Sequence, residues 1–286
     1  MLLPNGKSEG ENMLGAIIGD IVGSRFQFLD YKSKNFEFFE EHCVPTDDSF
    51  MTLAVAAALV ICAGKSDTDR LKSVTEKMMK SVARDHKNTG WGGNFYRWLF
   101  EGSTFNESYG NGAGMRVSPV GWVAESETEV KRLSKAVTEI SHNHPEGLRG
   151  AECVAMAVYL ARTGMEKAAI RARLTQEYYP ELADMTLDKI RPDYGIDDGG
   201  SWVTCRGSIP QAMTAFFEST GFEDAIRNAI SIGGDADTIG CMTGAVAEAY
   251  YGVSREMEER ALRYLTDDLK RLYFAFDLVK RKRVLQ

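Results

Sequence analysis

Residues 230–240 read ISIGGDADTIG, a stretch that places two carboxylates between two strongly apolar segments of helical spacing. The paired glycines allow a tight backbone turn just before the acids. Because apolar residues flank them on both sides, Asp235 and Asp237 are expected inside the protein rather than in solvent. Neighbouring carboxylates repel each other when buried, unless a cation lies between them. The stretch therefore predicts a buried cation site within a helical fold.

A second acidic cluster, Thr46-Asp47-Asp48-Ser49, opens an almost continuously apolar pattern that ends near Ala63. This pattern is too long for a strand and predicts a central helix with acids at its N-terminus. Taken alone, either cluster is more simply a solvated helix cap. Each cluster also contains a threonine hydroxyl and no local His or Cys, and such all-oxygen ligands suit Mg²⁺ or Mn²⁺ better than Zn²⁺.

The remaining hydrophobic patterns are helical, and alternating strand patterns are nearly absent, so the fold class is predicted to be all-α. Residues Met13 to Phe26 predict a buried helix, in which Gly15, Gly19 and Gly23 let another backbone approach closely. Further helices are expected at 68–85, 93–101, 129–141, 147–163, 166–177, 208–219, 222–232, 238–252 and 255–279. Because no linker or repeat divides it, the chain is predicted to form a single domain at 13–286 after a disordered leader at 1–12.

Composition narrows the class of protein further. The chain has 286 residues and a formal net charge of -7, which argues against nucleic acid as the main partner, because binding nucleic acid relies on clustered cations. Five cysteines, odd in number and without a C-x-x-C pair, predict a reducing, cytoplasmic location. No stretch reaches the roughly 20 apolar residues of a membrane span, and the N-terminus lacks the features of a signal peptide.

Six segments in order resemble the ADP-ribosylglycohydrolase family: residues 15–24, 46–49, 110–116, 143–146, 207–212 and 233–238. Together they form a specific match, whereas any one of them alone is a weak signal. The resemblance implies an all-α, roughly orthogonal helical bundle with a dinuclear Mg²⁺ or Mn²⁺ site at the bottom of a cleft. It also implies a hydrolase that removes ADP-ribose from a modified protein side chain, with arginine as the default acceptor.

The same resemblance assigns metal ligands to both acidic clusters: Thr46, Asp47 and Asp48 on one side of the metal pair, and Asp235, Asp237 and Thr238 on the other. Asp47 and Asp48 would also act in catalysis, while a metal-activated water attacks the anomeric carbon of the distal ribose. The carboxylates and the contacts between ribose and metal would stabilise an oxocarbenium-like state. Asp20 is expected to orient a metal-bound water or a capping group rather than to bind metal.

Two glycine-rich loops are candidates for substrate binding. The segment Gly110-Asn111-Gly112 can turn several backbone N–H groups toward a pyrophosphate, although a plain turn is the simpler interpretation of this motif alone. By resemblance, this loop contacts the phosphates of ADP-ribose, Met115 belongs to the same substrate site, and the Gly92 loop lies against the same ligand. For His144, which precedes a helix, a capping role and a role at the substrate edge stay equally open.

The chain departs from the family at a catalytic position, where Gln27 replaces the usual glutamate. Glutamine can hydrogen-bond but cannot accept a proton at neutral pH, and losing a general base costs about 10²–10⁴ in rate. Three explanations stay open. Gln27 is an engineered change that traps a ligand, a natural variant in which Asp47 or a metal-bound hydroxide suffices, or the mark of a protein that binds ADP-ribose with little turnover.

Three functions therefore compete. The leading hypothesis is a hydrolase with two divalent cations that acts on an ADP-ribosylated protein, and the alternative is a catalytically weakened ADP-ribose-binding or immunity-type protein. A helical enzyme that ionises prenyl diphosphates is disfavoured, because Asp47-Asp48 lacks a third acid about four residues on. The acceptor residue, the choice between Mg²⁺ and Mn²⁺ and the oligomeric state do not follow from the sequence.

Overall fold

The structure of the protein is a computed structural model that describes residues 13–62, 67–104, 107–196 and 200–284. The leader predicted at residues 1–12 lies outside the described residues. Within the described residues there is no β-strand, and the single isolated bridge joins Gly110 to Thr204. The predicted all-α fold class is confirmed.

The described chain forms helices at α1 (Gly15–Gly23), α2 (Asp47–Ile61), α3 (Thr68–Asp85), α4 (Gly93–Phe100), α5 (Gly112–Met115), α6 (Ser118–Val123), α7 (Glu127–Thr138), α8 (Pro145–Arg162), α9 (Lys167–Glu177), α10 (Leu187–Ile190), α11 (Cys205–Phe217), α12 (Phe222–Ile230), α13 (Ala236–Tyr251), α14 (Arg255–Leu262) and α15 (Asp267–Val284). Short 3₁₀ turns lie at η1 (Ser24–Phe26), η2 (Pro180–Ala183) and η3 (Ser201–Val203). Most predicted helices agree closely with these bounds. The short helices α5, α6 and α10 were not predicted, because they span too few residues for a periodic pattern to emerge.

The helix predicted at 255–279 is wrong as a single element, because the chain leaves the helix after α14 and starts again at α15. Between them, Leu265 is buried and the Tyr264 hydroxyl donates to the carbonyl oxygen of Glu40 at 3.0 Å. Asp267 and Asp268 then lie in the first turn of α15, where acids interact favourably with the helix dipole. These contacts, and the acids that favour a new helix start, break the single helix that the continuous apolar pattern of the sequence predicts.

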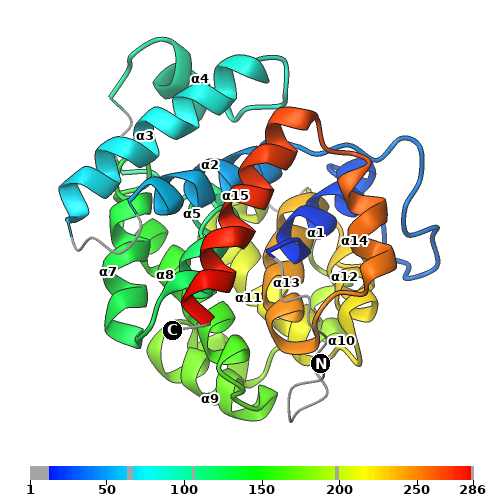
Figure 1. Cartoon of the computed structure of the whole chain (residues 1–286). Helices are drawn as coiled ribbons and strands as arrows, with labels where there is room; N and C mark the ends of the chain where they lie inside the picture. Colours follow the sequence, from blue (N-terminus) through cyan, green and yellow to red (C-terminus); the bar gives the residue numbers. More distant parts are fainter. Residues whose placement is uncertain (1–12, 63–66, 105–106, 197–199, 285–286) are drawn as a thin grey trace.

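Helices α1 and α13 lie side by side near the centre of the molecule (Figure 1). A Cβ atom on Gly19 would lie 2.0 Å from the carbonyl oxygen of Gly240, and one on Gly15 would lie 2.3 Å from that of Gly244. Only glycine fits at such a backbone contact, so the predicted close approach of a second backbone is confirmed. The contact places Asp20, on α1, beside the N-terminus of α13.

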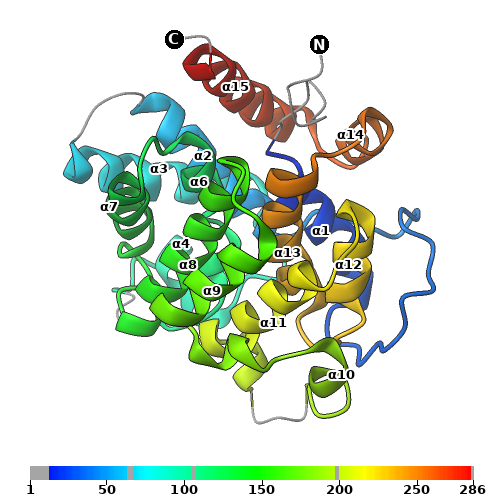
Figure 2. The ribbon, with the colours of Figure 1, turned by 90° about the horizontal axis from the view of Figure 1, so that it is seen from below.

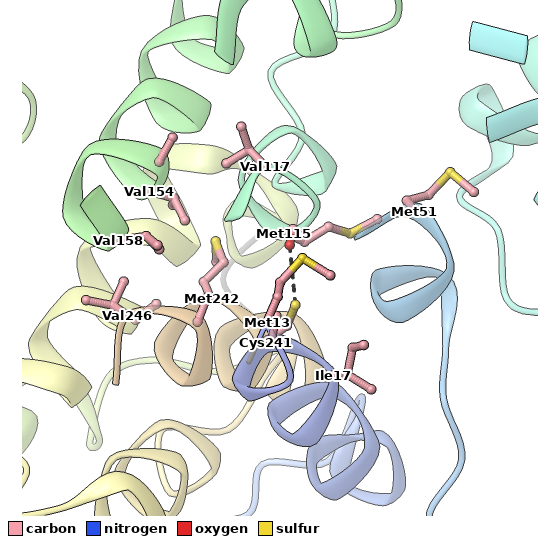
Figure 3. Close-up of a cluster of buried hydrophobic side chains, with 14 of the residues drawn as sticks. Met13, Ile17, Met51, Met115, Val117, Val154, Val158, Cys241, Met242 and Val246 are labelled. Atoms are coloured by element: carbon pink, nitrogen blue, oxygen red, sulfur yellow. Dashed lines mark hydrogen bonds between the residues drawn. The ribbon is translucent and has the colours of Figure 1, made fainter. Parts of the chain in front are cut away.

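Helix α2 packs against α1 and α13 on one side and against α3 and α15 on another. Figure 2 shows α14 and α15 along one edge of the molecule and α10 toward the opposite edge. In the core, Figure 3 shows Met242 of α13 toward Val154 and Val158 of α8, and Met13 near Met115 and Cys241. The Met115 carbonyl oxygen accepts hydrogen bonds from Cys241 Sγ at 3.4 Å and from Thr52 Oγ1 at 3.2 Å. These bonds tie α5 to α13 and α2.

Each of the five cysteines is free and buried: Cys43, Cys62, Cys153, Cys205 and Cys241. The cytoplasmic location inferred from them stays a prediction. Within the described ranges, every helix is too short or too polar to cross a lipid bilayer.

Candidate active site

Three helices bring their acidic residues to one point. Asp20 lies in the middle of α1, Asp48 in the first turn of α2, and Asp237 in the first turn of α13. One carboxylate oxygen from each of the three lies within 4.8 Å of those from the other two, and all three side chains are buried. The close packing of α1 on α13 thus joins the two acidic clusters of the sequence, which lie nearly 190 residues apart.

Asp20 fixes the start of α2. Its carboxylate accepts hydrogen bonds from Thr46 N at 2.9 Å, Thr46 Oγ1 at 2.6 Å and Ser49 N at 3.1 Å, and also from the Ser49 hydroxyl. Burial raises the pKa of Asp20 to about 6, although these hydrogen bonds partly offset the effect. The hydrogen bonds fit the orienting role predicted for Asp20, and its position also allows it to share a cation with Asp48 and Asp237.

Asp48 and Asp237 each keep one oxygen without a hydrogen-bond partner among the described residues. Asp48 Oδ2 accepts from Thr238 Oγ1 at 3.2 Å and Asp237 Oδ1 from Thr238 N at 2.9 Å, whereas Asp48 Oδ1 and Asp237 Oδ2 are buried and unpaired. An unpaired buried carboxylate oxygen is costly unless it contacts a cation or takes up a proton. Burial, reinforced by neighbouring carboxylates, holds the pKa of both groups well above the ordinary value.

Asp47 and Asp235 complete the group. Burial and the charges of Asp20 and Asp235 raise the pKa of Asp47 to about 7. Burial also raises the pKa of Asp235, although Asn111 Nδ2 donates to Asp235 Oδ2 at 2.6 Å and works against the shift. Among the described residues that shift the pKa values of these five carboxyls most, none is a lysine or an arginine. This buried group of oxygen ligands, here called the acidic cluster, can therefore hold a metal ion.

A cavity of about 350 Å³ opens beside the acidic cluster. It is called the glycine cavity here, because two glycine-rich segments form part of its wall, and its lining residues include these predicted ones: Gln27, Asp47, Asp48, Gly92, Gly110, Asn111, Gly112, Met115, Asp235 and Thr238. Its size falls in the range of small-molecule sites. His144 is not among the lining residues; its Nδ1 accepts from Glu146 N at 3.1 Å and caps α8.

The sequence reasoning missed two lining residues that form a buried pair, Arg116 and His142. Arg116 is fully buried, its Nη2 donates to Ser141 Oγ at 2.6 Å, and it lies 3.2 Å from His142 Nδ1. Burial, together with the charge of Arg116, holds the pKa of His142 well below its usual range, so the ring is neutral. Because Nδ1 faces donors, the ring proton is assigned to Nε2. Arg116 lies in the segment 110–116 and His142 directly before the segment 143–146, and these positions were the available signal.

Gln27 lies at the acidic cluster. Its side chain hydrogen-bonds with Asp235, an interaction that works to lower the pKa of that carboxyl, and it lines the glycine cavity. The next residue, Phe28, adopts a φ of 62°, which is uncommon for a non-glycine residue. Its backbone N donates to the carbonyl oxygen of Gly234 at 3.2 Å. These contacts connect the Gln27 segment to the turn that precedes Asp235.

Comparison with known proteins places the chain in a family. The sequence model of ADP-ribosylglycohydrolase matches residues 11–284. ADP-ribosylhydrolase ARH3 of Mus musculus is 24% identical over 86% of this chain and 84% of its own length. ADP-ribosylarginine hydrolase Tri1 of Pseudomonas putida is 25% identical over 85% and 70% respectively. ADP-ribosyl-[dinitrogen reductase] glycohydrolase of Rhodospirillum rubrum is 26% identical over 84% of each chain.

A solved structure described as an ADP-ribosylglycohydrolase-related protein complex has the same fold. It superposes with a TM-score of 0.68 at 23% identity and covers 94% of this chain and 96% of its own. The family match extends over nearly the whole described chain, from before α1 to the end of α15. The resemblance predicted from six ordered segments is confirmed, and the chain belongs to the ADP-ribosylglycohydrolase family of glycosyl hydrolases.

Proposed function

We propose that the protein is a metal-dependent hydrolase that releases ADP-ribose from a modified protein side chain. The observation that carries the proposal is the acidic cluster, in which two buried carboxylate oxygens lack a partner within the described chain. The cluster forms one wall of a cavity whose other walls contain glycine backbone and Arg116. In such a cavity, a sugar would bind at the carboxylates, and its phosphates would bind near the glycine backbone and Arg116.

The proposed metal ligands are the residues of the two acidic segments: Thr46, Asp47, Asp48, Asp235, Asp237 and Thr238. The site fits two hard divalent cations, because its donors are oxygens and its orphaned carboxylate oxygens need positive partners. When bound, such cations would polarise substrate oxygens and make water a stronger nucleophile. Asp20 would keep the first turn of α2 in place through its hydrogen bonds to Thr46 and Ser49.

In the proposed reaction, the oxygen of water bonds to the anomeric carbon of ribose, and the bond from that carbon to the acceptor nitrogen or oxygen breaks. The departing acceptor group takes up the proton that water loses. Gln27 cannot take part as a base. Asp47, which lines the cavity, is the carboxylate proposed to accept the proton and pass it on.

Arginine is the acceptor proposed first, in line with the relative named ADP-ribosylarginine hydrolase. The purified protein with Mg²⁺ or Mn²⁺ is expected to release ADP-ribose from an arginine-modified target, and Asp237→Asn is expected to stop the release. Failure to release ADP-ribose from several acceptors, with metal shown to be bound, would defeat the proposal.

A catalytically weakened ADP-ribose-binding protein is the second candidate, because Gln27 lies against the acidic cluster in place of a glutamate. This candidate predicts tight binding of ADP-ribose with negligible turnover, and activity that appears in Gln27→Glu. A wild-type rate equal to that of Gln27→Glu would count against it.

A further inference from the structure

A second cavity, of about 340 Å³, adjoins the glycine cavity and shares Gln27, Asp47 and Gly90 with it. It is called the Asn88 cavity here, and its other lining residues are Ser24, Val44, Pro45, Thr46, Asn88 and Thr89. Because Asp47 lines both cavities, the acidic cluster stands at the wall between them. A substrate whose reacting bond lies at the acidic cluster would therefore extend a different part into each cavity.

The two cavities differ in charge. Arg116 lines the glycine cavity, whereas the described residues around the Asn88 cavity include no lysine, arginine or histidine, and their one charged member is Asp47. With two divalent cations bound, the acidic cluster would still carry one net negative charge, since its five carboxylates exceed the four positive charges. This charge acts on both cavities, but only the glycine cavity has a cation, Arg116, that favours a phosphate; the Asn88 cavity has none to offset Asp47.

The polar groups around the Asn88 cavity offer hydrogen-bond acceptors. Thr89 Oγ1 donates to a backbone carbonyl at 2.9 Å and Ser24 Oγ to another at 2.8 Å, so the protons of both hydroxyls are already used. The amide oxygens of Gln27 and Asn88 and the carboxylate of Asp47 add further acceptors. A guanidinium group has five N–H donors and no acceptor, and is the protein side chain that complements such a lining best.

We propose that the Asn88 cavity receives the acceptor side chain of the substrate, and that it favours the guanidinium of arginine over an anionic acceptor such as a further ADP-ribose unit. This inference rests on the proposed function, because it divides one substrate between two cavities at the bond that is cleaved. Val44 is exposed at this cavity and would contact the aliphatic stem of the arginine.

The test adds one positive charge to each cavity in turn. Asn88→Lys changes the Asn88 cavity, and the matched variant Asn94→Lys changes the glycine cavity; both native side chains are exposed, so both variants are expected to fold. Asn88→Met supplies similar bulk without charge. The measurements, made with divalent metal present, are the KM for a peptide ADP-ribosylated on arginine and the Kd of free ADP-ribose.

We expect Asn88→Lys to raise the KM of the arginine conjugate about tenfold while the Kd of ADP-ribose changes less than about twofold, because the added charge repels only the acceptor. Asn88→Met should raise the KM less, and Asn94→Lys should change the KM and the Kd by the same factor. Equal changes of KM and Kd in Asn88→Lys, or no change in either, would overturn the inference and leave the hydrolase activity in place.

Failure of the proposed function gives a different result, since the wild-type protein would then release no ADP-ribose from any conjugate. In that case the intact conjugate serves as a binding probe in calorimetry. Tighter binding of ADP-ribosyl-arginine than of ADP-ribose, lost in Asn88→Lys, would support the assignment of the Asn88 cavity. Equal binding of the two ligands would refute it.

Discussion

The tripeptide Thr-Asp-Asp begins two helices of this chain, α2 at residues 46–48 and α15 at residues 266–268. At the start of α2, Asp48 is 2% exposed and belongs to the acidic cluster. At the start of α15, the Asp267 side chain is 89% exposed and pairs with Lys270 on the next turn. The same three residues thus form a buried candidate metal site in one place and an ordinary helix cap in the other.

The two tripeptides also shift their pKa values in opposite directions. Burial and neighbouring carboxylates raise the pKa of Asp47 to about 7. For Asp268, partial burial works to raise the pKa, but hydrogen bonds with Thr266 and His86 outweigh it and the pKa is lowered. His86 Nε2 lies 2.9 Å from Asp268 Oδ2. Local sequence therefore specifies a helix start in both places, and the surroundings determine its chemistry.

The largest expected effect is on hydrolysis and separates the two tripeptides most sharply. Asp48→Asn is expected to lower the rate of ADP-ribose release more than about 100-fold, because it removes a proposed metal ligand and even outer partners of a metal contribute about 10–100-fold. Asp268→Asn, the matched change at the exposed tripeptide, should leave the rate within about twofold. The measurement is release from an arginine-modified target at saturating Mg²⁺ or Mn²⁺. Equal losses in both variants would mean that the tripeptides do not differ in function.

The second prediction concerns the contact between α1 and α13, which helps to bury the tripeptide at residues 46–48. Gly19→Ala should lower the free energy of unfolding by about 3 kcal/mol, because its Cβ would lie 2.0 Å from a backbone oxygen that cannot rotate away. Gly221→Ala, where no atom lies within 4 Å of the added Cβ, should cost less than about 1 kcal/mol. Urea denaturation of the metal-free proteins measures both values. Similar losses for the two variants would show that the α1–α13 contact tolerates a methyl group.

The sequence predicted the central helices more completely than the residues that line the glycine cavity. Long apolar periods predicted α2 and α13, and glycines four residues apart in α1 predicted a close backbone contact. Arg116 and His142 were missed, because their pairing depends on how α5 packs beside the turn after α7. The break before α15 was missed for a related reason, since Tyr264 bonds to Glu40 from a distant part of the chain. Periodicity records burial along one element and not contacts between elements.

The third prediction uses pH to detect the acidic cluster. The folded-state pKa of Asp20 is about 6 and that of Asp47 about 7, both above the ordinary 3.8, so the metal-free folded protein binds more protons than the unfolded chain. Stability contributed by the cluster is therefore present below about pH 4 and falls as pH rises to about 7. The gain in melting temperature on adding Mg²⁺ or Mn²⁺ should grow over the same range. Parallel pH curves with and without metal would contradict this.

The smallest expected effect is on the free energy of unfolding, which the matched substitutions in the two tripeptides should change in opposite directions. Asp268→Asn should lower the free energy of unfolding by about 0.5 kcal/mol at pH 7, because it weakens a partly buried pair with His86 and a favourable interaction with the helix dipole. Asp48→Asn should instead raise the free energy of unfolding of the metal-free protein, because the folded state must either protonate Asp48 or hold its charge beside other carboxylates, and an amide avoids both costs. The lowered pKa of Asp268 means that its contribution is present above the ordinary pKa and disappears at lower pH, opposite to the acidic cluster. Chemical denaturation at pH 7 and pH 3 gives both signs. Destabilisation of both variants without metal would contradict the expected opposite signs. It would mean that the hydrogen bond from Thr238 to Asp48 stabilises the fold more than repulsion among the carboxylates destabilises it.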